Sequence, residues 1–482
     1  MELMFNPFLA RLDTIRRAVG IPKSVNTVSK LTVSRLNVST SWGDVVTASD
    51  IHELRMLGIV IKPSSPIIVI INWRCIISDV KLPEQVLTPC NYYEKRYGRP
   101  NVATMKYVLI AGEASGDLHA SQLIKYIREE DPAAEFRFFG GDLMAREARR
   151  NPDLHYDKMN VMGFSEVLRS LPRILRNMKQ AKALLREYRP DAVILVDYPG
   201  FNLQVAEYAH KLGIKVHYFI SPKVWAWKEW RVPKIKKTVD HMYSILPFEE
   251  EFYAKHDYKV EYVGNPSVEE MSYAIGHIPP KKYFLERQGI TDPRPIIALL
   301  PGSRRGEIRN NLPLMVEAAK RFPEFQYVIG AAPSVPEKFF REIAQDPGLK
   351  VVFGCTPTLL KYSQAAVVVS GTATLETALI GTPQVVVYRA NGSRISYNIM
   401  SHLLKVKYVS LPNLIVNNMI IPELLVDRCT VDAIARELSP LLQPSPKLTF
   451  QQQGYKNMQR RLGNSVAAQT AAALIVDYTR KA

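Results

Sequence analysis

Strand-length apolar runs alternate with amphipathic helix patterns from Met105 onward, and this alternation constrains the fold more than any other feature of the chain. Strands that alternate with helices at this spacing form parallel sheets with helices on both faces. The sequence therefore predicts an α/β fold. The expected strands lie at 105–111, 136–140, 192–196, 214–220, 296–300, 326–329, 350–353, 365–369 and 384–388.

A polar, proline-containing stretch at 267–295 divides the alternation into two halves. We predict two Rossmann-like doubly wound domains, at 105–280 and 281–440. Helices at 441–482 are expected to return to the first domain or to a partner subunit. Two such domains place a ligand cleft at the carboxyl ends of their strands. Residues 1–104 lack the alternation.

The chain has a net charge of +17, which favours anionic partners such as phosphorylated substrates, a membrane surface or nucleic acid. It contains no recognised nucleic-acid module, so we expect no nucleic-acid partner. The four cysteines form no C-x-x-C pair, which argues against a zinc site or a disulfide framework and fits a reducing cytoplasm. No apolar run reaches the length of about 18 residues that spans a bilayer.

A strand, a turn of small residues and a helix start follow one another at 365–376. Free N–H groups at a helix N-terminus attract phosphate, and the helix dipole adds to the attraction. Glu376 lies about one turn inside the helix, where a carboxylate can accept hydrogen bonds from a ribose diol. The segment predicts a nucleotide-diphosphate site, with an ordinary capped βα turn as the alternative. The phosphate-binding candidates are Ser370, Gly371, Thr372, Ala373 and Thr374.

Gly302, Ser303 and Arg304 follow the first strand of the second domain. The N–H groups of such a turn donate to phosphate, and a guanidinium binds two phosphate oxygens at once. The pattern predicts a second part of the diphosphate site, with solvated surface charge as the alternative. The chain has no D-x-D motif, the carboxylate pair that usually holds the metal of a sugar-nucleotide transferase. We therefore expect no metal and no cofactor, and positive groups that neutralise the diphosphate.

Two loops of the first domain carry further candidates. Asp197 directly follows the strand at 192–196, where it can act as a general base with a raised pKa or cap the next helix. The loop after 105–111 has two glycines that allow a ligand to approach the backbone, although a plain tight turn is the alternative. The candidates in this loop are Gly112, Glu113, Ser115, Gly116 and Asp117.

The segment 161–176 combines an apolar helical stripe with interleaved basic residues. A helix of this kind can lie on an anionic bilayer, and the alternative is a core-facing helix with a solvated basic face. The apolar candidates are Phe164, Val167, Leu168 and Leu171. The segment 221–228 carries two tryptophans and basic residues, which can pack a sugar or an acyl group or fill a core.

Taken together, these segments closely resemble the lipid-A-disaccharide synthases, which are family 19 glycosyltransferases with a GT-B fold. The resemblance covers about residues 105–480. The matching stretches are 111–117, 161–168, 197–202, 221–227, 246–249, 299–307, 370–376 and 408–413.

This resemblance implies transfer of 2,3-diacylglucosamine from UDP-2,3-diacylglucosamine to 2,3-diacylglucosamine 1-phosphate, which yields a β-1,6-linked disaccharide 1-phosphate and UDP. It implies inversion at the anomeric carbon without a metal. It also implies a peripheral protein at the cytoplasmic face of the inner membrane, bound to an anionic membrane surface, and a homodimer with exchanged C-terminal parts.

Residue by residue, Asp197 matches the family's candidate general base and Arg304 matches an arginine needed for activity. The stretch 370–374 would hold phosphate, Glu376 would bind the ribose, and the apolar residues of 161–176 match a patch associated with lipid contact. Gly200 departs from the pattern, because the comparable position can carry a second Asp. Asn265 also departs, because it stands where a histidine is common.

Residues 1–104 have no counterpart in that family, and we expect Met105 to be the native start. Two other functions remain open at this point. One is another GT-B enzyme, such as a UDP-N-acetylglucosamine 2-epimerase, and the other is a basic nucleic-acid-binding protein.

Overall fold

The computed structural model describes residues 104–159, 164–346, 348–389 and 407–481, except for the side chains of 164–170 and 227. Residues 1–101 form a separate unit, of which two short strands are described. In that unit β1 (Ile59–Val60) pairs antiparallel with β2 (Ile70–Ile71). Everything below concerns the second unit, residues 102–482.

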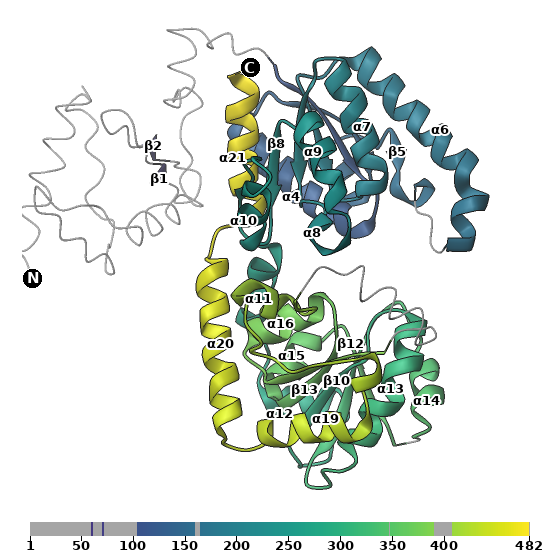
Figure 1. Ribbon diagram of the computed structural model, residues 1–482, viewed down its shortest axis with the longest axis vertical. Helices are drawn as coiled ribbons and strands as arrows, with labels where there is room; N and C mark the ends of the chain where they lie inside the picture. Colours follow the sequence, from purple (N-terminus) through teal and green to yellow (C-terminus); the bar gives the residue numbers. More distant parts are fainter. Residues whose placement is uncertain are drawn as a thin grey trace, which may run out of the picture. The chain divides into compact units, whose positions relative to one another are not determined.

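A seven-stranded parallel sheet forms the first half of this unit, in the order β5-β4-β3-β6-β7-β8-β9 (Figure 1). Its strands are β3 (Lys106–Ala111), β4 (Glu135–Gly140), β5 (Leu154–His155), β6 (Ala192–Val196), β7 (Lys215–Phe219), β8 (His241–Ser244) and β9 (Glu261–Tyr262). Its helices are α4 (Ala114–Glu130), α5 (Asp142–Ala148), α6 (Phe164–Tyr188), α7 (Pro199–Lys211), α8 (Val224–Trp227), α9 (Val232–Thr238) and α10 (Phe248–Ala254). The next helix, α11 (Pro266–Gly276), packs on the second half, where Met271 belongs to the core.

A six-stranded parallel sheet forms the second half, in the order β12-β11-β10-β13-β14-β15. Its strands are β10 (Ile296–Leu300), β11 (Gln326–Ala331), β12 (Lys350–Phe353), β13 (Ser363–Val369), β14 (Gln384–Tyr388) and β15 (Glu423–Leu425). Its helices are α12 (Lys281–Arg287), α13 (Arg305–Ala319), α14 (Glu337–Ala344), α15 (Thr356–Tyr362), α16 (Thr372–Ile380), α18 (Leu411–Val416) and α19 (Val431–Leu438).

The predicted α/β fold with two Rossmann-like sheets is confirmed. Both sheets have the doubly wound order, in which the first and fourth strands lie side by side. All nine expected strands are present, within about one residue at most ends. The strands β5, β8, β9 and β15 were not predicted, because runs of two to four residues are too short to show an apolar pattern.

Helices cover both faces of the first sheet, and alternate residues of β3 show this. Val108 and Ile110 belong to a core built with α6, α7 and α9, whereas Leu109 and Ala111 belong to a core built with α4. Side chains that follow one another along a strand point to opposite faces, so a strand packed on both faces needs apolar residues at successive positions. This explains why β3 is apolar from Tyr107 to Ala111 rather than alternating.

Two long C-terminal helices complete the unit, α20 (Pro446–Leu462) and α21 (Ala467–Arg480). The side chain of Gln451 in α20 hydrogen-bonds to both backbone polar groups of Gln384. Its Oε1 accepts from the Gln384 N–H at 2.7 Å, and its Nε2 donates to the Gln384 carbonyl at 3.0 Å. The chain then returns to the first sheet, where Ile475 of α21 is buried in the core formed by α4 and β3. Figure 1 shows α21 beside this sheet and α20 beside the second one.

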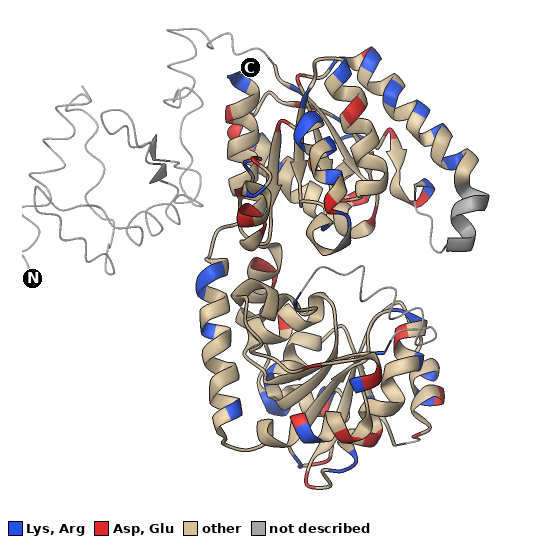
Figure 2. Cartoon of the chain, viewed as in Figure 1, with Lys and Arg blue, Asp and Glu red and all other residues tan. Residues whose placement is uncertain are grey.

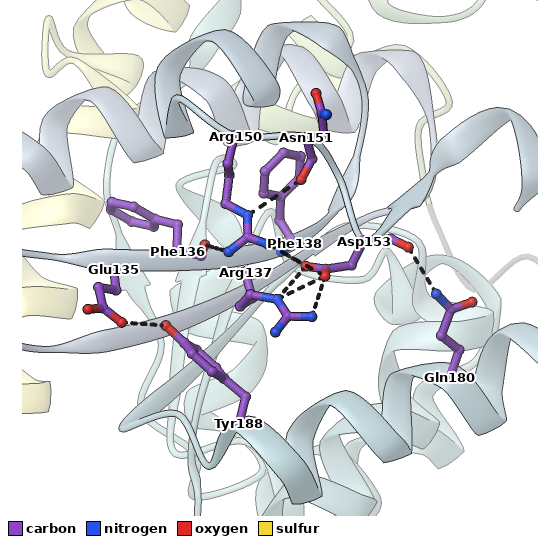
Figure 3. A network of polar contacts seen from close by, with 9 residues as sticks. All are labelled: Glu135, Phe136, Arg137, Phe138, Arg150, Asn151, Asp153, Gln180 and Tyr188. Atoms are coloured by element: carbon purple, nitrogen blue, oxygen red, sulfur yellow. Dashed lines mark hydrogen bonds and ion pairs between the residues drawn. The ribbon is translucent and has the colours of Figure 1, made fainter.

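The helix α6 is attached to the edge of the first sheet by a polar network (Figure 3). Arg137 of β4 forms an ion pair with Asp153, with Nε 2.8 Å from Oδ1. Gln180 of α6 donates to the Asp153 carbonyl at 2.9 Å, and Tyr188 donates to Glu135 at 3.2 Å. The helical stripe predicted within 161–176 lies, from Phe164 onward, in one continuous helix that contains Pro172 and ends at Tyr188.

Replacement of Ile475 by alanine tests the return of α21. The side chain is fully buried, so its loss should lower the free energy of unfolding by about 2–5 kcal/mol. Chemical denaturation measures this change. Gln469→Ala, at an exposed position of the same helix, is the control and should change the free energy by less than about 0.5 kcal/mol. Equal effects of the two changes would contradict the burial of Ile475.

Candidate functional site

The strand order brings the predicted site residues together in pairs. In the first sheet β3 pairs with β6, so the loop at Gly112 and Glu113 lies beside Asp197. In the second sheet β10 pairs with β13, so the loop at 302–304 lies beside 370–371. Both pairs follow the carboxyl ends of the first and fourth strands, where doubly wound sheets bind ligands.

The backbone around Asp197 is held in an unusual conformation. Asp197 and Tyr198 both have a positive φ, 46° and 49°. The Asp197 N–H donates to the Phe219 carbonyl at 3.0 Å, and its own carbonyl accepts from the Tyr218 hydroxyl at 2.6 Å and from Asn202 Nδ2 at 2.8 Å. A non-glycine residue in this region costs on the order of 1–3 kcal/mol and persists only where the surroundings impose it. These hydrogen bonds thus hold the Asp197 carboxylate beyond the end of β6.

Charges around Asp197 shift the pKa values of two carboxyl groups. Desolvation raises the pKa of Asp197, and the nearby Lys223 partly opposes this rise. Desolvation also raises the pKa of Glu113, and Asp197 raises it further. Arg304, from the second sheet, lowers the pKa of Glu113. The electrostatic effect of Arg304 therefore reaches the loops of the first sheet.

The carboxylate of Glu307, in the first turn of α13, closes the loop that precedes this helix. Glu307 Oε2 accepts from the N–H groups of Ser303 and Arg304 at 3.3 Å each. Glu307 Oε1 accepts from Arg304 Nη1, also at 3.3 Å, although the Arg304 side chain is 84% exposed. Gly302 has a φ of +100°, and a Cβ there would lie 2.6 Å from Glu307 Oε2. The turn therefore needs glycine at position 302. The N–H groups of Ser303 and Arg304 both donate to the Glu307 carboxylate.

The start of α16 differs in one detail from the prediction. The Ser370 N–H donates to the Val387 carbonyl at 3.0 Å and so belongs to the sheet. Gly371 is the N-cap, and Thr374 donates its hydroxyl to the Gly371 carbonyl at 2.8 Å. The amides of Thr372 and Ala373 open the helix at positions that have no acceptor within it.

Glu376, one turn into α16, is partly buried. Desolvation raises its pKa, and Glu270 of α11 raises it further. The packing of α11 against α16 therefore brings a second carboxyl group toward the position predicted for the ribose. Glu270 could not be predicted from the sequence, because it lies 106 positions away in another helix.

Asp117 has a structural position that its sequence context did not reveal. Its carboxylate is buried and accepts from the N–H groups of Gly141, Leu143 and Met144, at 2.7, 3.1 and 3.2 Å. It thereby caps the start of α5, which is far from it in sequence. Within the predicted 112–117 loop, Gly112 and Gly116 are also buried, whereas Glu113 and Ser115 are exposed.

The apolar candidates of α6 are only partly described. The side chains of Phe164, Val167 and Leu168 lie outside the described residues. Leu171 is exposed, as is Leu175 one turn further on. Lysines and arginines follow along the same helix (Figure 2). Among the described helices none combines the length and apolar character needed to cross a membrane.

Sequence reasoning did not single out two residues that lie near the site, Tyr198 and Lys223. Tyr198 packs its ring against Gly112, where a Cβ would lie 2.4 Å from the ring carbon Cδ1. Lys223 was noted only as a basic residue of 221–228, and its effect on Asp197 depends on the pairing of β6 with β7. In the described ranges, no group of three His, Cys, Asp or Glu residues is arranged to hold a metal ion.

Two Rossmann-ordered sheets with paired loops at their first and fourth strands define an α/β protein of the GT-B class, the class of many nucleotide-sugar enzymes. A family model described as "Lipid-A-disaccharide synthetase" matches residues 107–476. The chain therefore belongs to the lipid-A-disaccharide synthetase family.

Curated relatives agree with this assignment. The chain is 41% identical over 380 residues to the lipid-A-disaccharide synthase of Myxococcus xanthus, covering 77% of this chain and 97% of the relative. It is 36% identical over 384 residues to that of Syntrophus aciditrophicus, covering 78% and 98%.

Among solved structures, the chain is similar to the UDP-GlcNAc 2-epimerase of Neisseria meningitidis bound to UDP-GlcNAc. The TM-score is 0.53 at 14% identity, and the match covers 78% of this chain and 100% of the epimerase. At this identity the likeness supports the fold alone, so the epimerase alternative is not favoured.

Replacement of Gly112 by alanine tests the contact with Tyr198. The added Cβ would displace the Tyr198 ring, so the free energy of unfolding should fall by about 1–3 kcal/mol. Gly200→Ala is the matched control, because a Cβ there has no neighbour within 4 Å. Denaturant titration of both variants measures the difference, and an unchanged stability of Gly112→Ala would contradict the contact.

Proposed function

We propose that the chain transfers 2,3-diacylglucosamine from UDP-2,3-diacylglucosamine to 2,3-diacylglucosamine 1-phosphate and releases UDP. The observation that carries this proposal is the family match across residues 107–476, which spans both sheets and every predicted site loop. The product is the β-1,6-linked disaccharide 1-phosphate.

Asp197 acts as the general base in this proposal. As the acceptor 6-oxygen forms its bond to the anomeric carbon, the bond from that carbon to the UDP oxygen breaks. The proton of the 6-hydroxyl passes to the Asp197 carboxylate, and the configuration at carbon 1 inverts. A raised pKa makes Asp197 a stronger base than an ordinary aspartate, and its fixed backbone orients it without further ordering.

The second sheet binds UDP in this proposal. Arg304 leaves Glu307 for the diphosphate, which the exposure of its side chain allows. Further donors come from Gly302, Ser303 and the start of α16, from Ser370 to Thr374, where the helix dipole favours an anion. Glu376 accepts from the ribose hydroxyls. These groups would neutralise the leaving UDP without a metal.

The loop after β3 binds the acceptor in this proposal. Glu113 and Ser115 are exposed and contact it directly, whereas Gly112 and Gly116 shape the loop. Asp117 acts indirectly, because its carboxylate is already engaged by α5.

We further propose that residues 105–280 form the acceptor and lipid domain and 281–440 the UDP-sugar domain, with 441–482 returning to the first domain or to a partner subunit. In this proposal Leu171, which is exposed on α6, and the candidates Phe164, Val167 and Leu168 contact the anionic cytoplasmic surface of the inner membrane. The protein is peripheral there and forms a homodimer.

Substitution of Asp197 by asparagine tests the base. Turnover of the two lipid substrates should fall about 100-fold or more, because the amide cannot accept the proton. In the unmodified protein, kcat/KM should fall on acidification at a higher pH than for an ordinary aspartate, since desolvation raises the pKa of Asp197.

Asp477→Asn, at an exposed ion pair with Lys481, is the control and should keep full turnover. Release of UDP and formation of disaccharide are measured together at several pH values. Turnover of Asp197→Asn near that of the unmodified protein would remove Asp197 as the base.

Substitution of Arg304 by lysine tests the diphosphate contact. Lysine keeps the charge but loses the two-pronged geometry, so UDP affinity measured by calorimetry should fall about 10-fold or more. Arg309→Lys, one helical turn further along α13, is the control. Unchanged UDP affinity in Arg304→Lys would place the diphosphate elsewhere.

A further inference from the structure

A buried carboxyl group, Glu249 of α10, lies outside the proposed mechanism. Its side chain is 1% exposed. Its Oε1 accepts from the indole N–H of Trp225 at 2.8 Å, and the Trp225 ring packs edge-on against Phe248 with ring centres 4.9 Å apart. A buried carboxyl group in contact with an indole N–H fixes the position of that indole.

Two further buried oxygens lie next to this contact. Glu249 Oε2 and Ser221 Oγ are both buried, and neither has a hydrogen-bond partner within the described part of the chain. Ser221 nevertheless lowers the pKa of Glu249, so the two groups are close to each other. Desolvation raises the pKa of Glu249 to about 7. The Ser221 hydroxyl can donate to Oε2, and a hydrogen bond to the ionised carboxylate lowers its pKa, which opposes the effect of burial.

The segment between β7 and α9 is held by α10 at two points. Tyr253 of α10 donates to the Pro222 carbonyl at 3.4 Å, and Glu249 accepts from Trp225. Lys223 lies between these two anchors and is exposed. The position of the Lys223 backbone is therefore set by contacts that α10 makes on either side of it.

Lys223 acts on both carboxyl groups of this region. It lowers the pKa of Asp197 and it lowers the pKa of Glu249. The strand pairing explains this, because Val196 of β6 stands opposite Phe219 of β7, and both chains leave the sheet at the same edge. The strand ends thus bring Lys223 close enough to act on both the proposed base and the buried acid.

We propose that Glu249, through the indole of Trp225, positions Lys223 beside Asp197, where the ammonium group stabilises the Asp197 carboxylate. The role given to Asp197 rests on the proposed function. The contact of Glu249 with Trp225 and the coupling to Lys223 do not depend on it. Glu249 and Trp225 are positioning residues, since neither contacts the reacting atoms.

Several other charged and polar groups surround Asp197 and Glu249. Glu113 faces Asp197 from the loop after β3 and Arg304 acts on Glu113, whereas the Tyr218 hydroxyl binds the Asp197 carbonyl. The groups around Glu249 are Ser221, Trp225, Lys223 and Tyr253. Lys223 lowers the pKa of both carboxyl groups. Its removal should therefore raise both pKa values.

A first experiment needs no substrate. The indole N–H resonance of Trp225, assigned by its loss in Trp225→Phe, is followed by NMR against pH. It should shift with a midpoint at about pH 7 as Glu249 ionises. Glu249→Gln should abolish this transition, Lys223→Met should move it to higher pH, and the exposed Glu251→Gln should leave it unchanged. A transition that persists in Glu249→Gln, or that ignores Lys223→Met, would overturn the proposal.

A second experiment measures kcat/KM against pH with the two lipid substrates. Lys223→Met should move the acid limb upward by about 0.5–1 pH unit, and Lys223→Arg should restore it. Trp225→Phe should move the limb in the same direction, and Glu249→Gln, which keeps an acceptor for the indole, should not. Lys237→Met, an exposed lysine of α9, is the control. An unchanged limb in Lys223→Met would overturn the proposal.

Melting temperatures separate these effects from loss of folding. If Trp225→Phe does not fold, the result for Lys223→Met decides whether the proposal holds. The Lys223 side chain is exposed, so its replacement should leave the fold intact. Absence of turnover in the unmodified protein would refute the proposed function, and the NMR titration would then decide the contact and the coupling without it.

Discussion

The order of strands in the two parallel sheets is the constraint on which the rest of the structure depends. In each sheet the first and fourth strands are neighbours, so the loops that follow them diverge from one point at the carboxyl edge. Asp197 and Glu113 meet at one such point, and the Arg304 loop meets the start of α16 at the other. Neither pair is close in sequence, and each is brought together by the pairing of its two strands.

The loops at these points are stiff, because buried polar groups hold their backbones. Asn202 and Tyr218 bind the carbonyl of Asp197, and Asp117 binds three amides of the neighbouring α5 loop. Each of these side chains is costly to bury without partners, so each also stabilises the turn that satisfies it. The same polar residues therefore serve both the stability of the fold and the placement of exposed carboxylates.

Most of the architecture could be predicted because parallel strands are buried on both faces and so are apolar along their whole length. The central strands β6 and β10 are of this kind, whereas the predicted edge strand β12 is partly exposed. The four missed strands lie at or next to a sheet edge and have two to four residues, too few to show a pattern. For the site, sequence reasoning found Asp197 and Arg304 at strand ends. It could not separate exposed Glu113 from buried Asp117, because both follow the same strand and only the packing of α5 distinguishes them.

The sequence by itself determined the fold class, the family and the loops that carry polar residues, because these depend on local apolar patterns and on motifs in a fixed order. The tertiary structure alone decided which charges act on one another. Lys223, Glu249 and Asp197 follow three successive strands, and their coupling arises only when β6, β7 and β8 lie side by side. Electrostatic effects depend on distance through space and on burial, and neither quantity is written in the spacing of residues along a chain.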